Sequence, residues 1–86
     1  MPGRLELYGT RSCPFTLELR EQLEWDGRDF ADYDVEADPE ALARLAALHP
    51  GPLTVPVLVE DGQVVQVGWQ GRGCGVTRPE ESQDER

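Results

Sequence analysis

Positive charge is scarce in this 86-residue chain, which carries eight basic side chains against seventeen acidic ones and a formal net charge of -9. Such a surface repels the phosphate backbone of nucleic acids and anionic lipid headgroups. No hydrophobic run approaches the roughly 20 residues that span a bilayer, and the first residues lack the apolar stretch of a secretory signal. We therefore expect no nucleic-acid partner, no membrane partner and a cytoplasmic location.

Cysteine and histidine are also rare, with two of the former and one of the latter. Two cysteines without an export signal argue against a dense disulfide framework and for reactive or metal-binding thiols. The spacing of Cys13, His49 and Cys74 matches no metal motif, so we predict no metal site. A chain of this size buries only about 60% of its unfolded surface, so a cross-link or a partner would contribute markedly to stability.

The sequence pattern indicates one α/β domain over residues 1–76, followed by a polar segment, residues 77–86, that we expect to be disordered. Strands and helices alternate, with strands expected at 5–8, 30–35, 55–60 and 63–67 and helices at 14–25 and 40–48. The Asp61-Gly62 pair favours a tight hairpin between the last two strands. The order β-α-β-α-β-β predicts a four-stranded mixed sheet with helices on its faces.

Cys13 follows the first strand and directly precedes Pro14 and the first helix. The unpaired amides and the positive end of the dipole at a helix N-terminus stabilise an anion. Such placement lowers a thiol pKa from about 8.5 to within about 3.5–7.5, and Arg11 adds positive charge nearby. The alternative, a buried thiol that fills the core, fits poorly because this position lies on no apolar face. We predict a reactive thiolate.

Thr16 stands where Cys-x-x-Cys oxidoreductases carry a second thiol, so Cys13 cannot form a disulfide within this motif. Its hydroxyl either donates a hydrogen bond to the sulfur or bonds only to backbone. Cys74 is a second candidate resolving thiol, because its glycine-rich turn could approach the first helix. Closing a loop of about 60 residues would restrict the unfolded chain by about 4 kcal/mol. A bystander thiol and an intermolecular link are the alternatives for Cys74.

Thr54-Val55-Pro56 is the other informative segment, since a proline at the start of a strand is a place where a cis peptide bond can be kept. A cis bond would turn the Val55 backbone outward beside Cys13, where it could pair with an extended thiol-bearing peptide. Base rates alone favour a trans bond.

Residues Leu7–Thr16, Thr54-Val55-Pro56 and the turn Gly71–Gly75 together resemble a glutaredoxin of the thioredoxin fold. The resemblance covers about residues 4–76 and is greatest to the UXX-star (seleno)protein group, whose nucleophile can be selenocysteine where this chain has Cys13. It implies a thioredoxin-like fold whose C-terminal helix is short or missing.

The resemblance also implies residue roles. Cys13 would be the nucleophile, assisted by Thr16, with Cys74 as a possible resolving thiol and a cis bond before Pro56. The implied substrate-binding and glutathione-binding residues surround that thiol: Arg11, Pro14, Phe15, Thr54, Val55, Pro56, Gly73 and Gly75. No tightly bound cofactor is implied, and glutathione would be a co-substrate.

The leading hypothesis is a thiol-disulfide oxidoreductase that attacks disulfide or glutathionylated protein substrates. One alternative is an iron-sulfur carrier or sensor of the monothiol glutaredoxin type, in which two protomers share a cluster. Another is a thiol or selenol peroxide reductase acting through a sulfenic acid at Cys13. The missing C-terminal helix would leave one sheet face thinly covered, which suggests a homodimer through that face.

Overall fold

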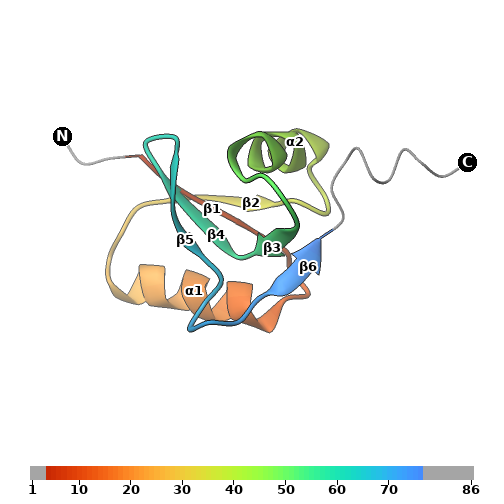
Figure 1. Ribbon diagram of the computed structural model, residues 1–86. Coiled ribbons are helices and arrows are strands. Elements are labelled where there is room, and N and C mark those ends of the chain that lie inside the picture. Colours follow the sequence, from red (N-terminus) through yellow and green to blue (C-terminus); the bar gives the residue numbers. More distant parts are fainter. Residues whose placement is uncertain (1–3, 77–86) are drawn as a thin grey trace, which may run out of the picture.

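The fold is described by a computed structural model that covers residues 4–76; the expected disordered tail, residues 77–86, lies outside the described residues. Strands and helices follow one another in the order β1 (Leu5–Gly9), α1 (Pro14–Trp25), β2 (Ala31–Asp34), α2 (Pro39–Leu48), β3 (Leu53–Val55), β4 (Val57–Glu60), β5 (Gln63–Val67) and β6 (Cys74–Val76). Figure 1 shows α1 and α2 on opposite sides of the central strands, with the β3 and β6 pair at one end.

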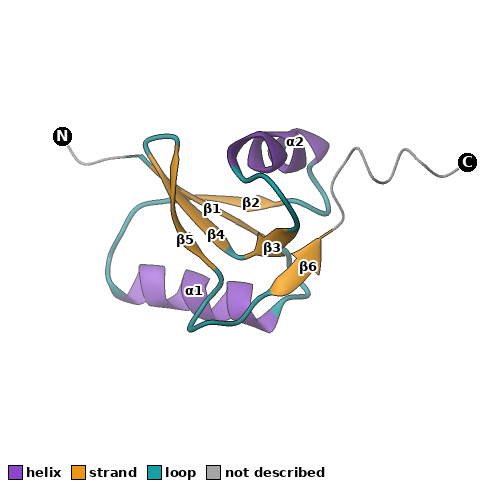
Figure 2. Cartoon of the chain, viewed as in Figure 1, coloured by secondary structure: helices purple, strands orange, loops and turns teal. Residues whose placement is uncertain are grey.

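The main sheet has four strands in the order β2-β1-β4-β5. Strands β1 and β2 are parallel and are joined through α1, whereas β4 is antiparallel to both β1 and β5. Asp61 and Gly62 both have positive φ, 55° and 80°, as a tight hairpin between twisted strands requires. The four-stranded mixed sheet and the hairpin predicted from the sequence are confirmed, and the layers are visible in Figure 2.

The structure corrects the sequence expectation at residues 53–60 and at the glycine-rich turn. The Val55–Pro56 peptide bond is cis, as the resemblance implies. However, β3 and β4 are separate strands on either side of Pro56, where a single strand was expected. Residues 74–76, expected to lie in a turn and at its end, form β6, which pairs antiparallel with β3. No helix follows β6 within the described part of the chain.

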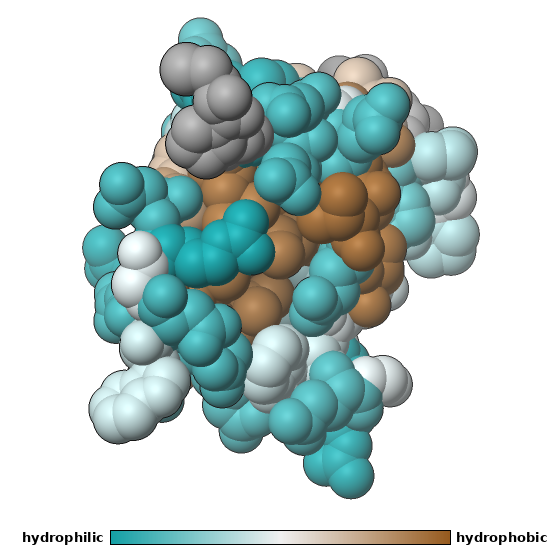
Figure 3. Space-filling view, turned by 90° about the vertical axis from the view of Figure 1, so that its left-hand side faces the viewer, coloured by the Kyte–Doolittle hydropathy of each residue, from teal (hydrophilic) through white to brown (hydrophobic). Residues whose placement is uncertain are grey.

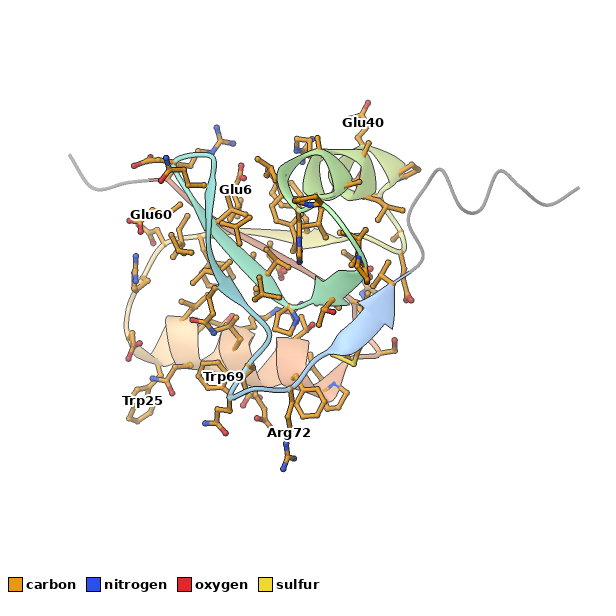
Figure 4. The ribbon with its side chains drawn as sticks, in the orientation of Figure 1. Glu6, Trp25, Glu40, Glu60, Trp69 and Arg72 are labelled. Atoms are coloured by element: carbon orange, nitrogen blue, oxygen red, sulfur yellow. A yellow bond between two sulfur atoms is a disulfide. The ribbon has the colours of Figure 1, made fainter. Side chains whose placement is uncertain are left out.

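The apolar residues form two clusters, one on each face of the sheet. The cluster beneath α2 gathers Tyr8, Cys13, Val35, Ala41, Leu45, Leu53, Val55, Val57 and Val59. The cluster beneath α1 gathers Leu5, Leu7, Leu19, Leu23 and Leu58, with Phe30 and Trp69 packed against it. Trp69 lies on the α1 side of the sheet in Figure 4 and packs against this cluster. Dimerisation through this face stays a prediction.

Each helix starts where the sequence indicates. Pro14 and Pro39 occupy the first turns of α1 and α2, where a missing N–H costs no hydrogen bond. The Asp38 side chain accepts hydrogen bonds from the backbone N–H groups of Glu40 and Ala41, at 3.1 and 3.3 Å. This cap fixes the start of α2 after the loop that leaves β2.

The end of the molecule at which β1 begins carries a shallow pocket of about 310 Å³ lined by Arg4, Leu5, Asp29, Phe30 and Ala31. Figure 3 looks onto this end and shows an apolar patch surrounded by polar side chains. The two cysteines lie beyond the opposite end of β1. Neither helix in residues 4–76 is long and apolar enough to cross a membrane.

Candidate active site

Cys13 and Cys74 are joined by a disulfide, with Cα atoms 6.1 Å apart across 61 residues of sequence. The bond links the start of α1 to β6, as Figure 4 shows. Cys13 is only 1% exposed and packs in the apolar cluster beneath α2, so the expectation that its position lies on no apolar face was wrong; Cys74 is half-buried. The two thiols that the sequence singles out are therefore brought together, and Cys74 is the more accessible of the two.

Cys13 is the N-cap residue of α1. Its N–H donates to the Thr10 carbonyl at 3.4 Å, and its carbonyl accepts from the Leu17 N–H at 3.2 Å. These two bonds hold the residue in an extended conformation at the mouth of the helix. The Cys13 side chain makes no capping hydrogen bond in the disulfide form, but its position at the N-terminus of α1 is one where a helix stabilises negative charge.

Val55 borders the Cys13 sulfur from the other side, and its carbonyl oxygen lies 3.9 Å from Cys13 Sγ. Val55 is fully buried, and its backbone faces β6 with Cys74 directly opposite. We expected this backbone to be free for an external peptide. In the disulfide form it pairs with residues 74–76 of the protein's own chain instead.

A tight reversal returns the chain from β5 to the site. The Trp69 and Arg72 backbones exchange two hydrogen bonds, of 2.7 and 3.0 Å, and the intervening Gln70 and Gly71 have φ of 54° and 79°. Gly68 donates its N–H to the Pro56 carbonyl at 2.6 Å, which anchors the start of the reversal beside the cis peptide bond. The sequence predicted a glycine-rich turn here but not strand β6, which follows it. The Gln70-Gly71 pair is the signal that could have indicated a hairpin.

Thr16 is buried three residues after Cys13, and neither of the two alternatives predicted for its hydroxyl, a hydrogen bond to the sulfur or one to backbone, is present in this state within residues 4–76. Its hydroxyl oxygen has no hydrogen-bond partner among the described residues. The side chain instead lies against Gly9, where a Cβ would overlap its methyl group and come within 2.7 Å of its hydroxyl oxygen. Thr16 thus closes the contact between the end of β1 and the first turn of α1.

The remaining site residues expected from the resemblance divide into two groups. Phe15 packs half-buried against the cluster beneath α2, and Pro56 is fully buried there. Pro14 and Arg11 are exposed. The Arg11 side chain points to Asp34, with Nε 3.8 Å from a carboxylate oxygen, so the structure gives it a partner other than the sulfur.

The β3 and β6 residues beside the sulfur differ in how closely they approach one another. Thr54 lies opposite Gly75 in the register, and a Cβ on Gly75 would meet no atom within 4 Å. Gly73 is the reverse case, because a Cβ there would lie 2.6 Å from the Val55 carbonyl oxygen and 2.5 Å from Thr54 Cγ2. Only a residue without a side chain fits at position 73.

A polar cluster under α2 is separate from the sulfur site. The Tyr8 hydroxyl donates to a Glu6 carboxylate oxygen at 3.0 Å and accepts from Arg44 Nε at 3.4 Å, while its ring stacks on Tyr33 with centroids 5.1 Å apart. Burial raises the pKa of Tyr8, and the Arg44 hydrogen bond offsets part of that rise. This cluster supports the sheet and α2 and reaches no sulfur atom.

Within residues 4–76, no three His, Cys, Asp or Glu side chains are grouped so as to hold a metal ion.

The mixed sheet with a helix on each face, a cysteine at the first helix start and a cis-proline beside it define a thioredoxin-like protein. The structure is similar to two crystal structures of the thioredoxin-like protein BC3987, one of them of a point mutant. Each gives a TM-score of 0.65 at 28% identity over 78% of this chain, and the match covers 89% of the one and 83% of the mutant.

Sequence comparison gives the family. The glutaredoxin family profile matches residues 5–65, and the chain belongs to the glutaredoxin family. It is 32% identical over 61 residues to the probable glutaredoxin slr1562 of Synechocystis sp. and 30% identical over 61 residues to the probable glutaredoxin ssr2061 of the same organism. Each match covers 71% of this chain, but 56% of the length of slr1562 and 69% of ssr2061.

Proposed function

We propose that this protein is a thiol-disulfide oxidoreductase in which Cys13 attacks a mixed disulfide, such as a glutathionylated protein, and Cys74 resolves the intermediate. The observation that carries the proposal is the disulfide between a helix N-cap cysteine and a cysteine on β6. Membership of the glutaredoxin family supports the same chemistry.

The first step starts from the reduced protein. The Cys13 thiolate, stabilised at the α1 N-terminus, attacks one sulfur of the substrate disulfide along the S–S axis. A new bond forms between Cys13 Sγ and that sulfur, and the other sulfur leaves as a thiolate that takes a proton from solvent. With a glutathionylated substrate, attack on the glutathione sulfur leaves glutathione on Cys13 and frees the protein thiol.

The second step forms the bond seen in the structure. The Cys74 thiolate attacks Cys13 Sγ, glutathione leaves as a thiolate, and the Cys13–Cys74 disulfide results. Two external thiols, such as two glutathione molecules, then reduce it and become a disulfide themselves. We infer that the first of them attacks Cys74, because that residue is half-buried while Cys13 is 1% exposed. Cys13 is then the leaving group, and helix-stabilised thiolates leave fastest.

The decisive test measures release of the protein thiol from a glutathionylated peptide, with glutathione as the reductant. Cys13→Ser should lose at least a hundredfold in rate, because the attacking sulfur is gone. Cys74→Ser is the matched variant: mixed with the glutathionylated peptide in the absence of free glutathione, it should attack once and accumulate the Cys13 mixed disulfide, visible by mass spectrometry. Unchanged turnover in Cys13→Ser would refute the assignment.

The same cysteine pair favours a second candidate, peroxide reduction. Peroxide would oxidise Cys13 to a sulfenic acid with loss of water or alcohol, and Cys74 would condense with it to the observed disulfide and release water. Peroxide consumption by the reduced protein, compared with its rate on mixed disulfides, separates the two functions.

We further propose that the protein belongs to the UXX-star group within the family. The basis is residues Leu7–Thr16, with cysteine at the position where that group can carry selenocysteine. A protein with selenocysteine at position 13 should keep the fold and attack mixed disulfides faster, since a selenol is ionised more readily than a thiol. An equal or slower rate would argue against this kinship.

A further inference from the structure

The pairing between β3 and β6 resembles an enzyme holding its own substrate. Cys74 is bonded to Cys13 and lies opposite Val55, and the two residues that follow it pair along β3 as an antiparallel strand. A foreign peptide joined to Cys13 through its own cysteine would need the same bond and the same backbone partners. Peptide addition to an open strand edge is a common recognition mode.

We infer that β6 occupies the β3 edge as an internal pseudo-substrate in the disulfide form, in the place that the thiol-bearing peptide of the proposed function would take, and that this edge demands an unbranched unit just before the peptide's cysteine. The inference rests on the proposed function, because the peptide must reach Cys13.

The demand for an unbranched unit comes from the close approach at Gly73. A Cβ at this position would lie 2.6 Å from the Val55 carbonyl oxygen, a backbone atom that cannot rotate away. The unit after the cysteine is unrestricted, because a Cβ on Gly75 would meet nothing within 4 Å. The γ-glutamyl unit of glutathione meets the demand as glycine does, since a methylene group precedes its amide.

The disulfide controls access to this edge. While it is closed, β6 covers the Val55 backbone and Cys13 is 1% exposed. After reduction, β6 is held on β3 only by the pairing of three residues, and an incoming peptide can displace β6 from this edge. The site is therefore open to partners when the protein is reduced and filled by its own chain when it is oxidised.

The test uses the full chain carrying Cys74→Ser and the peptides acetyl-X-Cys-Gly-Val-amide, each joined through its cysteine to thionitrobenzoate. Attack by Cys13 on the peptide sulfur releases the coloured thiol, and each rate is divided by the rate with a small free thiol. We expect X = Gly to react at least tenfold faster than X = Ala, a difference of about 1.4 kcal/mol. Replacing the glycine after the cysteine by alanine should change the rate less than twofold. Residual occupancy by β6 slows all peptides equally and leaves these ratios unchanged.

Equal rates for X = Gly and X = Ala would overturn the inference while leaving the proposed function in place, provided that release is lost in Cys13→Ser. Absence of release from every peptide would overturn both.

A second measurement keeps the native cysteines and titrates the internal disulfide against a glutathione redox buffer. Gly73→Ala should lower the equilibrium constant for forming that disulfide at least tenfold, and Gly75→Ala, its matched control, less than twofold. An unchanged constant in Gly73→Ala would show that β6 does not occupy the edge in solution, and would overturn the inference.

Discussion

Reduction of the Cys13–Cys74 disulfide should remove a large share of the protein's stability. The bond closes a loop across a sequence separation of 61 residues. In the chain-entropy description, a loop of this length removes about 14 cal/mol/K from the unfolded chain, which is about 4 kcal/mol at 25 °C. The total free energy of unfolding of a chain of 86 residues is typically only about 4 to 13 kcal/mol. The reduced, reactive form is therefore expected to be much less stable than the disulfide form.

Urea unfolding of the oxidised protein, the reduced protein and Cys74→Ser measures this difference. We expect the free energy of unfolding to fall by about 4 kcal/mol on reduction, with Cys74→Ser within about 1 kcal/mol of the reduced protein. Free energies should be compared rather than midpoints, because a cross-link makes the unfolded state more compact and lowers the slope. Reductant added to Cys74→Ser is the control and should change nothing.

A fall of less than about 1 kcal/mol would refute the loop-closure argument. It would mean that the reduced chain keeps the two cysteines close even when unfolded, or that the cross-link distorts the folded state enough to cancel its benefit.

Three further changes test other contacts. Gly9→Ala should destabilise the fold by about 2 kcal/mol because its Cβ overlaps the Thr16 side chain; part of this should return in the double variant with Thr16→Ala, and an equal loss there would contradict the explanation. Asp38→Ala should cost about 1 kcal/mol through loss of two cap hydrogen bonds, measured by thermal unfolding, and no loss would show that the cap contributes nothing. Because the pKa of Tyr8 is raised in the folded state, the contribution of Tyr8 to the free energy of unfolding is present below about pH 10 and is lost as pH rises through the higher folded pKa. Tyr8→Phe should therefore lose less stability at alkaline pH in urea unfolding, and a pH profile identical to that of the unchanged protein would contradict this.

Local pattern was sufficient to predict most of the main sheet and both helices. The alternating strand and helix patterns predicted α1 and α2, and Asp61-Gly62 predicted the hairpin between β4 and β5. These features are encoded within a few residues of sequence, where periodicity and turn chemistry act.

Strand β6 could not be predicted because three residues, Cys-Gly-Val, carry no period and contain a glycine. They are extended only because β3 and the disulfide hold them there. The same holds for the two expectations that needed correction near the sulfur. The Val55 backbone is occupied by a distant part of the chain, and the Thr16 hydroxyl is directed by how closely β1 approaches α1.

The Trp69–Arg72 reversal also determines where Cys74 lies along β3. A single residue separates it from Cys74, and side chains alternate sides along a strand. One extra residue in that spacer would place another residue opposite Val55 and turn the Cys74 side chain to the opposite face of the strand. Two extra residues would return the side chain to the original face, but would displace it by two positions along β3. The exact length of this short spacer, and not only its parity, thus decides whether the second sulfur can meet the first.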